Sequence, residues 1–379
     1  MNADIAALLA TAGITLDGME PWDPQVHDAR LYDRVLRDGP IAVGESYMDG
    51  WWDAEDLAGF CERAVRADLA KHLWNVRLWL HTARARLTNL QSVARAFEVG
   101  KRHYDIGNDL YEAMLDKRMT YSCGYWSPSP SFGEAAPDLE EAQRRKLELI
   151  CRKIGLARGD RVLDIGCGWG SFALYAATEY GAHVVGLTVS REQAAFARER
   201  ARGLPVEIRL EDYRAHDAPP YDHVVSIGMF EHVGHANYGA YFEAARRLLK
   251  PEGLFLLHTI GVDRTPKAPD PWFHRYIFPN GILPSPRLVA EAAERRFVLE
   301  DWHDFGADYE KTLRAWSANF DAAWPRLRSA YESREGGRFY RMWKFYLLSM
   351  AGTFRARHTN LWQVVFSPHG VRGGYRSVR

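Results

Sequence analysis

A glycine-rich turn near the middle of the chain has the residue types of a ligand-binding loop. Val162 to Ile165 form a short apolar run around Asp164, and glycines follow at positions 166, 168 and 170 before a helix-like segment. Because glycine lacks a Cβ atom, such a turn can approach a ligand closely, and the next helix then points its N-terminus at that ligand. The spacing differs from the Gly-x-Gly-x-x-Gly pattern of dinucleotide-binding turns. A turn that uses glycine for steric reasons alone stays an alternative.

Further candidate residues follow the strands that the sequence predicts after this turn. Apolar patterns predict strands at 184–187, 206–210, 223–227 and 254–259, with helices at 192–201 and 238–249. Such alternation implies an α/β fold with a parallel sheet and helices on both faces, in which ligands bind beyond the carboxyl ends of the strands. The residues at those ends are Asp164 to Gly170, Thr188, Ser190, Asp212, Tyr213, Glu231, His232 and His258.

The flanking segments predict the elements that support this sheet. A polar helix is expected over 138–154, and the C-terminal part predicts strands at 297–302 and 361–366 with helices at 309–324 and 338–354. Residues 262–284 are rich in proline and aromatic side chains and predict a long segment without regular structure. Such segments are typical of lids and binding loops.

Composition predicts a globular protein with an uneven charge distribution. The 379 residues contain 49 basic and 49 acidic side chains, so the overall charge gives no reason to expect nucleic acid as a partner. Residues 1–61 hold 12 acids and 3 bases, whereas residues 62–102 hold 9 bases and 3 acids. This asymmetry predicts a basic surface element. The length favours a large α/β domain with a smaller appended domain.

The N-terminal region, residues 1–95, predicts that smaller domain, and it is expected to be helical. Between Leu73 and Leu90 apolar residues recur every three or four positions, while Arg77, His81 and Arg84 fall on another face. This helix either packs on the large domain with a solvated basic side or lies against anionic lipid headgroups, and both interpretations stay open.

Cysteine usage and hydropathy indicate the compartment. The four cysteines form no Cys-x-x-Cys pair, and no basic region precedes the first apolar stretch, which predicts a cytoplasmic location. No run approaches the roughly 20 apolar residues that cross a bilayer, so any membrane contact is expected at the surface. The histidines lack the His-x-x-x-His spacing, and no catalytic metal is predicted.

Several long motifs in a fixed order carry a family resemblance. They are Gly44 to Trp52, His103 to Leu110, Tyr121-Ser122-Cys123, Met229 to Gly234, Leu257 to Gly261, Phe305 to Tyr309, and Leu361 to Phe366. With these motifs the chain closely resembles bacterial cyclopropane-fatty-acyl-phospholipid synthases over nearly its whole length. The resemblance implies a class I methyltransferase (Rossmann-like) fold, with a lipid-contacting helical domain at 1–95 and a catalytic domain at 96–379.

The resemblance also implies a reaction. In this family the methyl group of S-adenosylmethionine is added as a methylene across a cis double bond of a phospholipid acyl chain. Attack by the alkene leaves a carbocation, which aromatic faces stabilise and water would quench. Tyr121, Tyr125, Trp272 and Phe273 are the expected wall residues. The expected partners are an unsaturated phospholipid at the inner membrane surface and a second copy of the chain, forming a homodimer.

The resemblance further implies a base and a cofactor site. The family is understood to hold a bicarbonate ion as the base, and the matching positions are Cys123, Glu231, His258, Tyr309 and the backbone of Ile260, with Tyr121 beside them. Glu231 would accept the hydroxyl proton of the ion, while His258 and Tyr309 would donate to it. Taken alone, Cys123 also fits a packed small side chain, and His258 a hydrogen-bonded core histidine.

S-adenosylmethionine itself is expected at Tyr121, Ser122, Asp164, Gly166, Cys167, Gly168, Thr188, Gln193, Asp212 and Tyr213. Three departures accompany this assignment. Thr188 replaces the usual ribose-binding acid of methyltransferases, Glu211 stands where relatives carry glutamine, and the linker 127–138 is longer than usual.

Two other functions remain open at this point. One is a relative that leaves a methyl or methylene branch on the same kind of alkene, and the other is a non-catalytic lipid-binding protein.

Overall fold

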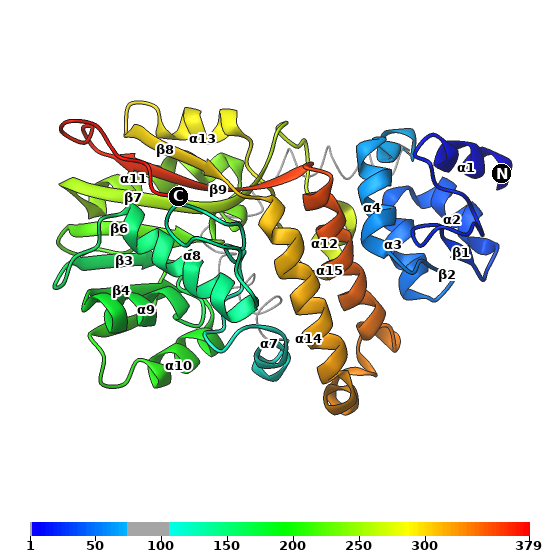
Figure 1. Ribbon diagram of the computed structural model, residues 1–379, viewed down its shortest axis with the longest axis horizontal. Helices are drawn as coiled ribbons and strands as arrows, with labels where there is room; N and C mark the ends of the chain where they lie inside the picture. Colours follow the sequence, from blue (N-terminus) through cyan, green and yellow to red (C-terminus); the bar gives the residue numbers. More distant parts are fainter. Residues whose placement is uncertain (1, 74–105) are drawn as a thin grey trace. The chain divides into compact units, whose positions relative to one another are not determined.

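The computed structural model describes residues 2–73 and 106–379 (Figure 1). The helix expected between Leu73 and Leu90, with its basic face, therefore lies outside the described residues except for Leu73. The chain divides into two compact units. Of the described residues, the first unit contains those before 74 together with Lys267–Pro279 and Tyr309–Thr359, and the second contains 106–266, Asn280–Asp308 and Asn360–Arg379. Two segments beyond residue 95 thus pack with the N-terminal residues, and the lipid-contacting role of 1–95 stays a prediction.

The first unit is mainly helical, as the sequence predicts for its N-terminal part. Its elements are α1 (Asn2–Ala10), α2 (Arg30–Asp38), α3 (Pro40–Met48), α4 (Leu57–Arg66), η1 (Leu69–Leu73), α12 (Pro271–Tyr276), α14 (Ala307–Tyr331), η4 (Arg334–Gly336) and α15 (Phe339–Arg355). A two-stranded ladder joins β1 (Gln25–Val26) to β2 (Trp52–Asp53). α4 packs on α15 so closely that a Cβ atom at Gly352 would lie 2.8 Å from the Cβ atom of Cys61.

The segment 44–52 has a packing role in this unit. A Cβ atom at Gly44 would lie 2.5 Å from the indole of Trp272 on α12. The neighbouring Glu45 pairs with Arg34 at 2.6 Å and accepts a hydrogen bond of 2.8 Å from the Tyr276 hydroxyl. The expectation that 262–284 lacks regular structure is therefore wrong for α12. Asp270 caps this helix by accepting from two backbone N–H groups, and Pro271 occupies its first turn.

A seven-stranded sheet organises the second unit, in the order β5-β4-β3-β6-β7-β9-β8. The strands are β3 (Arg161–Ile165), β4 (His183–Thr188), β5 (Val206–Leu210), β6 (Tyr221–Ile227), β7 (Leu249–Val262), β8 (Val298–Asp304) and β9 (Thr359–Ser367). β3 to β7 pair in parallel and β8 pairs antiparallel with β9. The predicted Rossmann-like, mostly parallel sheet is confirmed.

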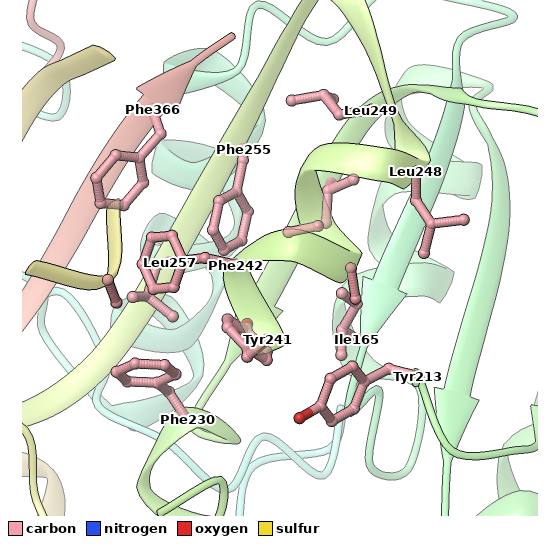
Figure 2. Packing of buried hydrophobic residues seen from close by; sticks show 14 of the residues in the cluster. Ile165, Tyr213, Phe230, Tyr241, Phe242, Leu248, Leu249, Phe255, Leu257 and Phe366 are labelled. Carbon is pink, nitrogen blue, oxygen red and sulfur yellow. The ribbon is translucent and has the colours of Figure 1, made fainter. Parts of the chain in front are cut away.

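Helices cover both faces of this sheet. Successive strand residues point to opposite faces, so Val225 and Leu256 face α8 (Leu139–Lys153) and α9 (Ser171–Tyr180), whereas Val224 and Phe255 face α11 (Tyr238–Leu248) and α13 (Pro286–Ala293). Figure 2 shows the second of these cores, with Phe242 of α11 beside Phe255 and Phe366. α10 (Arg191–Arg200) packs on β5, and α7 (Asn108–Met114) precedes the segment with Tyr121.

No helix within the described residues is both long and apolar enough to span a bilayer.

Candidate active site

A cavity of about 170 Å³ lies at the carboxyl ends of β3, β4 and β6, inside the second unit. The parallel strands bring their terminal residues together there, as the topology requires. All ten side chains expected at the cofactor line this cavity: Tyr121, Ser122, Asp164, Gly166, Cys167, Gly168, Thr188, Gln193, Asp212 and Tyr213. The residues expected at the cofactor therefore border one cavity.

The glycine-rich turn forms one wall and needs glycine for its backbone. Gly166, Gly168 and Gly170 have φ values of 84°, 55° and 84°, in the left-handed region that other residues resist. A Cβ atom at Gly166 would also lie 2.6 Å from the side chain of Met229. Between these glycines, Trp169 donates from its indole nitrogen to Oδ1 of Asn108 at 2.9 Å. The turn is thereby held against α7.

One end of the cavity combines an acid with a hydroxyl group. Burial raises the pKa of Asp164 to about 7, although the ammonium group of Lys146 acts in the opposite direction. Ser122 lines the same cavity, and its Oγ accepts a hydrogen bond of 2.8 Å from Nζ of Lys146. A carboxylate and a hydroxyl side by side suit the ammonium and carboxylate groups of an amino acid.

Another part of the cavity wall presents an oriented amide. Thr188 donates from its hydroxyl to Oε1 of Gln193 at 3.0 Å, and Ser190 accepts from the backbone N–H of Gln193 at the start of α10. Because Oε1 of Gln193 accepts this bond, its NH₂ group points away from the Thr188 hydroxyl. A Cβ atom at Gly168 would lie 4.0 Å from that nitrogen, so the amide borders the glycine-rich turn. An NH₂ donor beside the glycine turn suits the ring nitrogens or hydroxyls of a nucleoside.

Two acids on the loop after β5 are held by basic partners. Arg214 binds both carboxylate oxygens of Asp212, at 2.9 and 2.5 Å. Glu211 accepts from Nδ1 of the buried His216 at 3.0 Å, and Nε2 of His216 lies 3.0 Å from the Tyr221 hydroxyl. The glutamate that departs from the family pattern thus lines the cavity with its own buried partner.

A second polar cluster stands at the neighbouring ends of β6 and β7. Ile227 of β6 pairs in register with His258 of β7, and Glu231 follows in the short helix η2 (Phe230–His232). Oε1 of Glu231 accepts the backbone N–H of Ile260 at 2.6 Å. Burial raises the pKa of Glu231 to about 7, against the opposing effect of that N–H group. Glu231 therefore lies directly against the backbone of Ile260, another of the positions expected at the bicarbonate site.

Two buried polar atoms in this cluster have no hydrogen-bond partner among the described residues: Oε2 of Glu231 and Nε2 of His258. The amide nitrogen of Gln363 lies 3.3 Å from Nδ1 of His258. An amide nitrogen is a donor, so Nδ1 accepts and Nε2 carries the ring proton. Burial also lowers the pKa of His258 well below its usual value, which keeps the ring neutral. A small anion that both accepts and donates one hydrogen bond would satisfy both atoms.

The other candidates lie elsewhere. Cys123 is fully buried, and its thiol lies 3.1 Å from the carbonyl of Gly124. Tyr125 packs on Phe305 and His303 and is not among the residues that line the cavity. Three further candidates belong to the first unit, where Tyr309 packs on Phe354, Trp272 on Phe345, and Phe273 on Tyr346. Their roles in catalysis stay predictions.

Trp169 and His232, which the sequence places at the ends of strands, also line the cavity, and Met229 and Val233 lie in a motif that carries the family resemblance. Met119 and Arg214 line the cavity too, and sequence reasoning missed them. Met119 has a positive φ of 59° and precedes the Tyr121 segment, and no pattern in the sequence marks it.

The chain is similar to known proteins in sequence and in fold. The family model for mycolic acid cyclopropane synthetase matches residues 91–364. The cyclopropane-fatty-acyl-phospholipid synthase of Escherichia coli (strain K12) is 51% identical over 98% of this chain and 94% of its own length. The tuberculostearic acid methyltransferase UfaA1 of Mycobacterium tuberculosis is 32% identical, with coverages of 94% and 86%. The solved mycolic acid cyclopropane synthase CmaA1, complexed with SAH and CTAB, superposes with a TM-score of 0.63 and 32% identity over 71% of this chain and 97% of its own.

Proposed function

The chain belongs to the mycolic acid cyclopropane synthetase family and is an S-adenosylmethionine-dependent methyltransferase, and we propose that it is a cyclopropane-fatty-acyl-phospholipid synthase. Its substrate would be the cis double bond of an unsaturated acyl chain on a membrane phospholipid. The observation that carries this proposal is the cavity lined by all ten expected cofactor residues, next to a cluster with two unsatisfied buried polar atoms.

The chain's own groups suit each part of S-adenosylmethionine. Asp164 and Ser122 would hold the amino acid end, while Gln193 and the loop around Tyr213 would hold the nucleoside. When bound, this cofactor supplies a methyl group on a positively charged sulfur, which is electrophilic enough for attack by an alkene. Tyr121 lines the cavity and packs edge-on against Tyr111, so an aromatic surface borders the reacting region. Such surfaces exclude water and stabilise a developing cation.

Ring closure requires a base, and we propose bicarbonate, held by Glu231, His258 and the Ile260 backbone. Nε2–H of His258 can donate to an oxygen of this ion, and Oε2 of Glu231 can accept its hydroxyl proton. A glutamate that titrates near pH 7 is suited to exchange a proton at neutral pH. Cys123 and Tyr309 belong to this proposal by their match to the family motif.

We also propose where the protein is located and how it assembles. The basic stretch 62–102 supports contact with anionic headgroups, so we propose a cytoplasmic enzyme bound peripherally to the inner face of the membrane. A homodimer would place two such stretches on one membrane and increase binding through avidity.

A related product is the second candidate, because UfaA1 is named as a tuberculostearic acid methyltransferase and matches 94% of this chain. A methyl or methylene branch arises from the same cation, so the site described above serves both outcomes.

Product structure tests the proposal. Purified protein would be incubated with methyl-labelled S-adenosylmethionine and vesicles of a cis-monounsaturated phospholipid, and the lipid examined by proton NMR. Upfield ring-methylene signals are expected, together with sedimentation of the protein with the vesicles. Olefinic or methyl-branch signals would replace the proposed activity with the second candidate. Absence of label from the lipid would contradict both.

A further inference from the structure

Helix α8 contributes two fully buried polar side chains that contact Ser122, one of the residues lining the cavity. Gln143 and Lys146 are three residues apart, so they lie on the same face of the helix. The amide nitrogen of Gln143 donates to the carbonyl of Ser122 at 2.7 Å, and Nζ of Lys146 donates to Oγ of Ser122 at 2.8 Å. The backbone carbonyl and the hydroxyl of Ser122 are therefore both held by one helix.

The direction of the second hydrogen bond has a chemical consequence. An ammonium group has three donors and no acceptor, so Oγ of Ser122 must accept from Lys146. The hydroxyl proton of Ser122 is then left to be donated in another direction. Ser122 lines the cavity, whereas Lys146 is not among its lining residues. A hydroxyl fixed in this way presents a donor to an anionic group inside the cavity.

The surroundings of Lys146 keep it charged. Burial lowers the pKa of its ammonium group to about 8, while the nearby carboxylates of Asp116 and Asp164 act in the opposite direction. A pKa of about 8 leaves most of the groups protonated at neutral pH. Asp116 is itself held by the backbone N–H of Thr120 at 2.7 Å. The positive charge of Lys146 therefore lies next to the Ser122 hydroxyl, and it also acts on the carboxyl group of Asp164.

We propose that Lys146 is a positioning residue for the carboxylate of S-adenosylmethionine, because it fixes the Ser122 hydroxyl as a donor into the cavity. This inference rests on the proposed function, since it presupposes that S-adenosylmethionine occupies the cavity. It assigns the amino acid end of the cofactor to two groups of opposite character. Asp164 serves the ammonium group, and Ser122, backed by Lys146, serves the carboxylate.

The test compares two ligands that differ in one group. Decarboxylated S-adenosylmethionine keeps the amine, the sulfonium and the nucleoside but lacks the carboxylate. Isothermal titration calorimetry of the full-length protein and of Lys146→Met would give a Kd for each ligand. A hydrogen bond to a charged group predicts that Lys146→Met weakens S-adenosylmethionine binding by about tenfold or more. The affinity for the decarboxylated ligand should fall by much less, because its binding uses no carboxylate contact and loses only the support that Lys146 gives to the negative charge of Asp164.

Lys153 provides the matched control. It is also a fully buried lysine of α8, but its Nζ contacts His303 at 3.0 Å and Asp301 at 3.7 Å. Lys153→Met should lower the melting temperature without changing the ratio of the two Kd values. Ser122→Ala, which keeps Lys146, should weaken S-adenosylmethionine binding relative to binding of the decarboxylated ligand, as Lys146→Met does. The double variant should show no further loss of this preference. This second variant keeps the proposal testable if Lys146→Met fails to fold.

Two results would overturn the inference. If Lys146→Met weakens the binding of both ligands equally, Lys146 has a purely structural role. If Ser122→Ala leaves the preference for S-adenosylmethionine over the decarboxylated ligand unchanged, the hydroxyl does not recognise the carboxylate. The wild-type protein separates this failure from failure of the proposed function. If it binds neither ligand, the cofactor assignment itself is wrong.

Discussion

At the scale of single residues, burial sets the chemistry of two carboxyl groups in different ways. Asp164 and Glu231 both have a pKa near 7 because both are removed from water. Asp164 has the buried ammonium of Lys146 nearby, whereas Glu231 has only neutral partners, among them the N–H of Ile260. The first arrangement favours a fixed negative charge for binding, and the second favours a group that gains and loses a proton.

Glu231→Gln should separate catalysis from cofactor binding. Loss of a proton acceptor typically lowers turnover by about 100-fold or more, whereas the affinity for S-adenosylmethionine should stay unchanged because Glu231 does not line the cavity. Turnover would be measured by label transfer to vesicles, and affinity by calorimetry. Full turnover in the variant would contradict the proposed role of Glu231.

The same variant should change the dependence of stability on pH. The pKa of Glu231 rises from its usual 4.5 to about 7 in the folded protein, so the folded state holds this proton more tightly than the unfolded state. Stability is therefore lost as pH rises from about 4.5 to 7, by up to roughly 3 kcal/mol. Glu231→Gln removes this loss, and its melting temperature relative to wild type should increase between pH 5 and pH 8. The exposed Glu252→Gln is the control, and a constant difference for Glu231→Gln would contradict the expectation.

How far single residues could be predicted depended on where they stand in the elements. Glu231 and His258 were found because each stands at or just after the end of a parallel strand, and sheet topology brings such positions together. Lys146 was missed because the sequence of α8 reads as a polar helix, and hydropathy does not distinguish a lysine in solvent from one buried against a serine.

At the scale of elements, Asp308 at the start of α14 anchors the chain that follows the Tyr121 segment. This buried carboxylate accepts from the backbone N–H groups of Trp126 and Ser127, at 2.7 and 3.0 Å, and from the Ser127 hydroxyl at 2.7 Å. Asp308→Ala would leave these donors without their acceptor. We expect the free energy of unfolding to fall by about 3 kcal/mol, while Ser127→Ala should cost about 1 kcal/mol. Urea denaturation would measure both, and equal effects would indicate that the hydroxyl alone matters.

Element boundaries were predicted well for three strands of the parallel sheet. β4, β5 and β6 begin and end within two residues of their predicted limits. β7 begins at Leu249, five residues before its predicted start, because the chain passes from α11 directly into the strand. α12 was missed because a six-residue helix among prolines has too few turns to show a period.

At the scale of the whole molecule, the chain alternates between its two units, so neither unit is a continuous stretch. Among the described residues, the N-terminal helices share the first unit with Lys267–Pro279 and Tyr309–Thr359. A fragment of residues 1–95 would expose the face of α4 that contains Ala58 and Cys61, which packs on Gly352 of α15. We expect this fragment to lack a cooperative thermal transition by circular dichroism, in contrast to the full chain. Cooperative unfolding of the fragment would show that the N-terminal helices are stable without α15.

The same packing of α4 on α15 also determines when the first unit can fold during protein synthesis. α4 ends at Arg66 and α15 ends at Arg355, so the ribosome must add nearly the whole catalytic sequence before the first unit can close. At roughly 5 to 20 residues per second, this delay lasts on the order of 15 to 60 s. We expect the face of α4 that packs on α15 to lack this partner throughout that interval. A gene fusion that carried residues 1–95 alone would likewise transfer the N-terminal helices without α15, on which α4 packs.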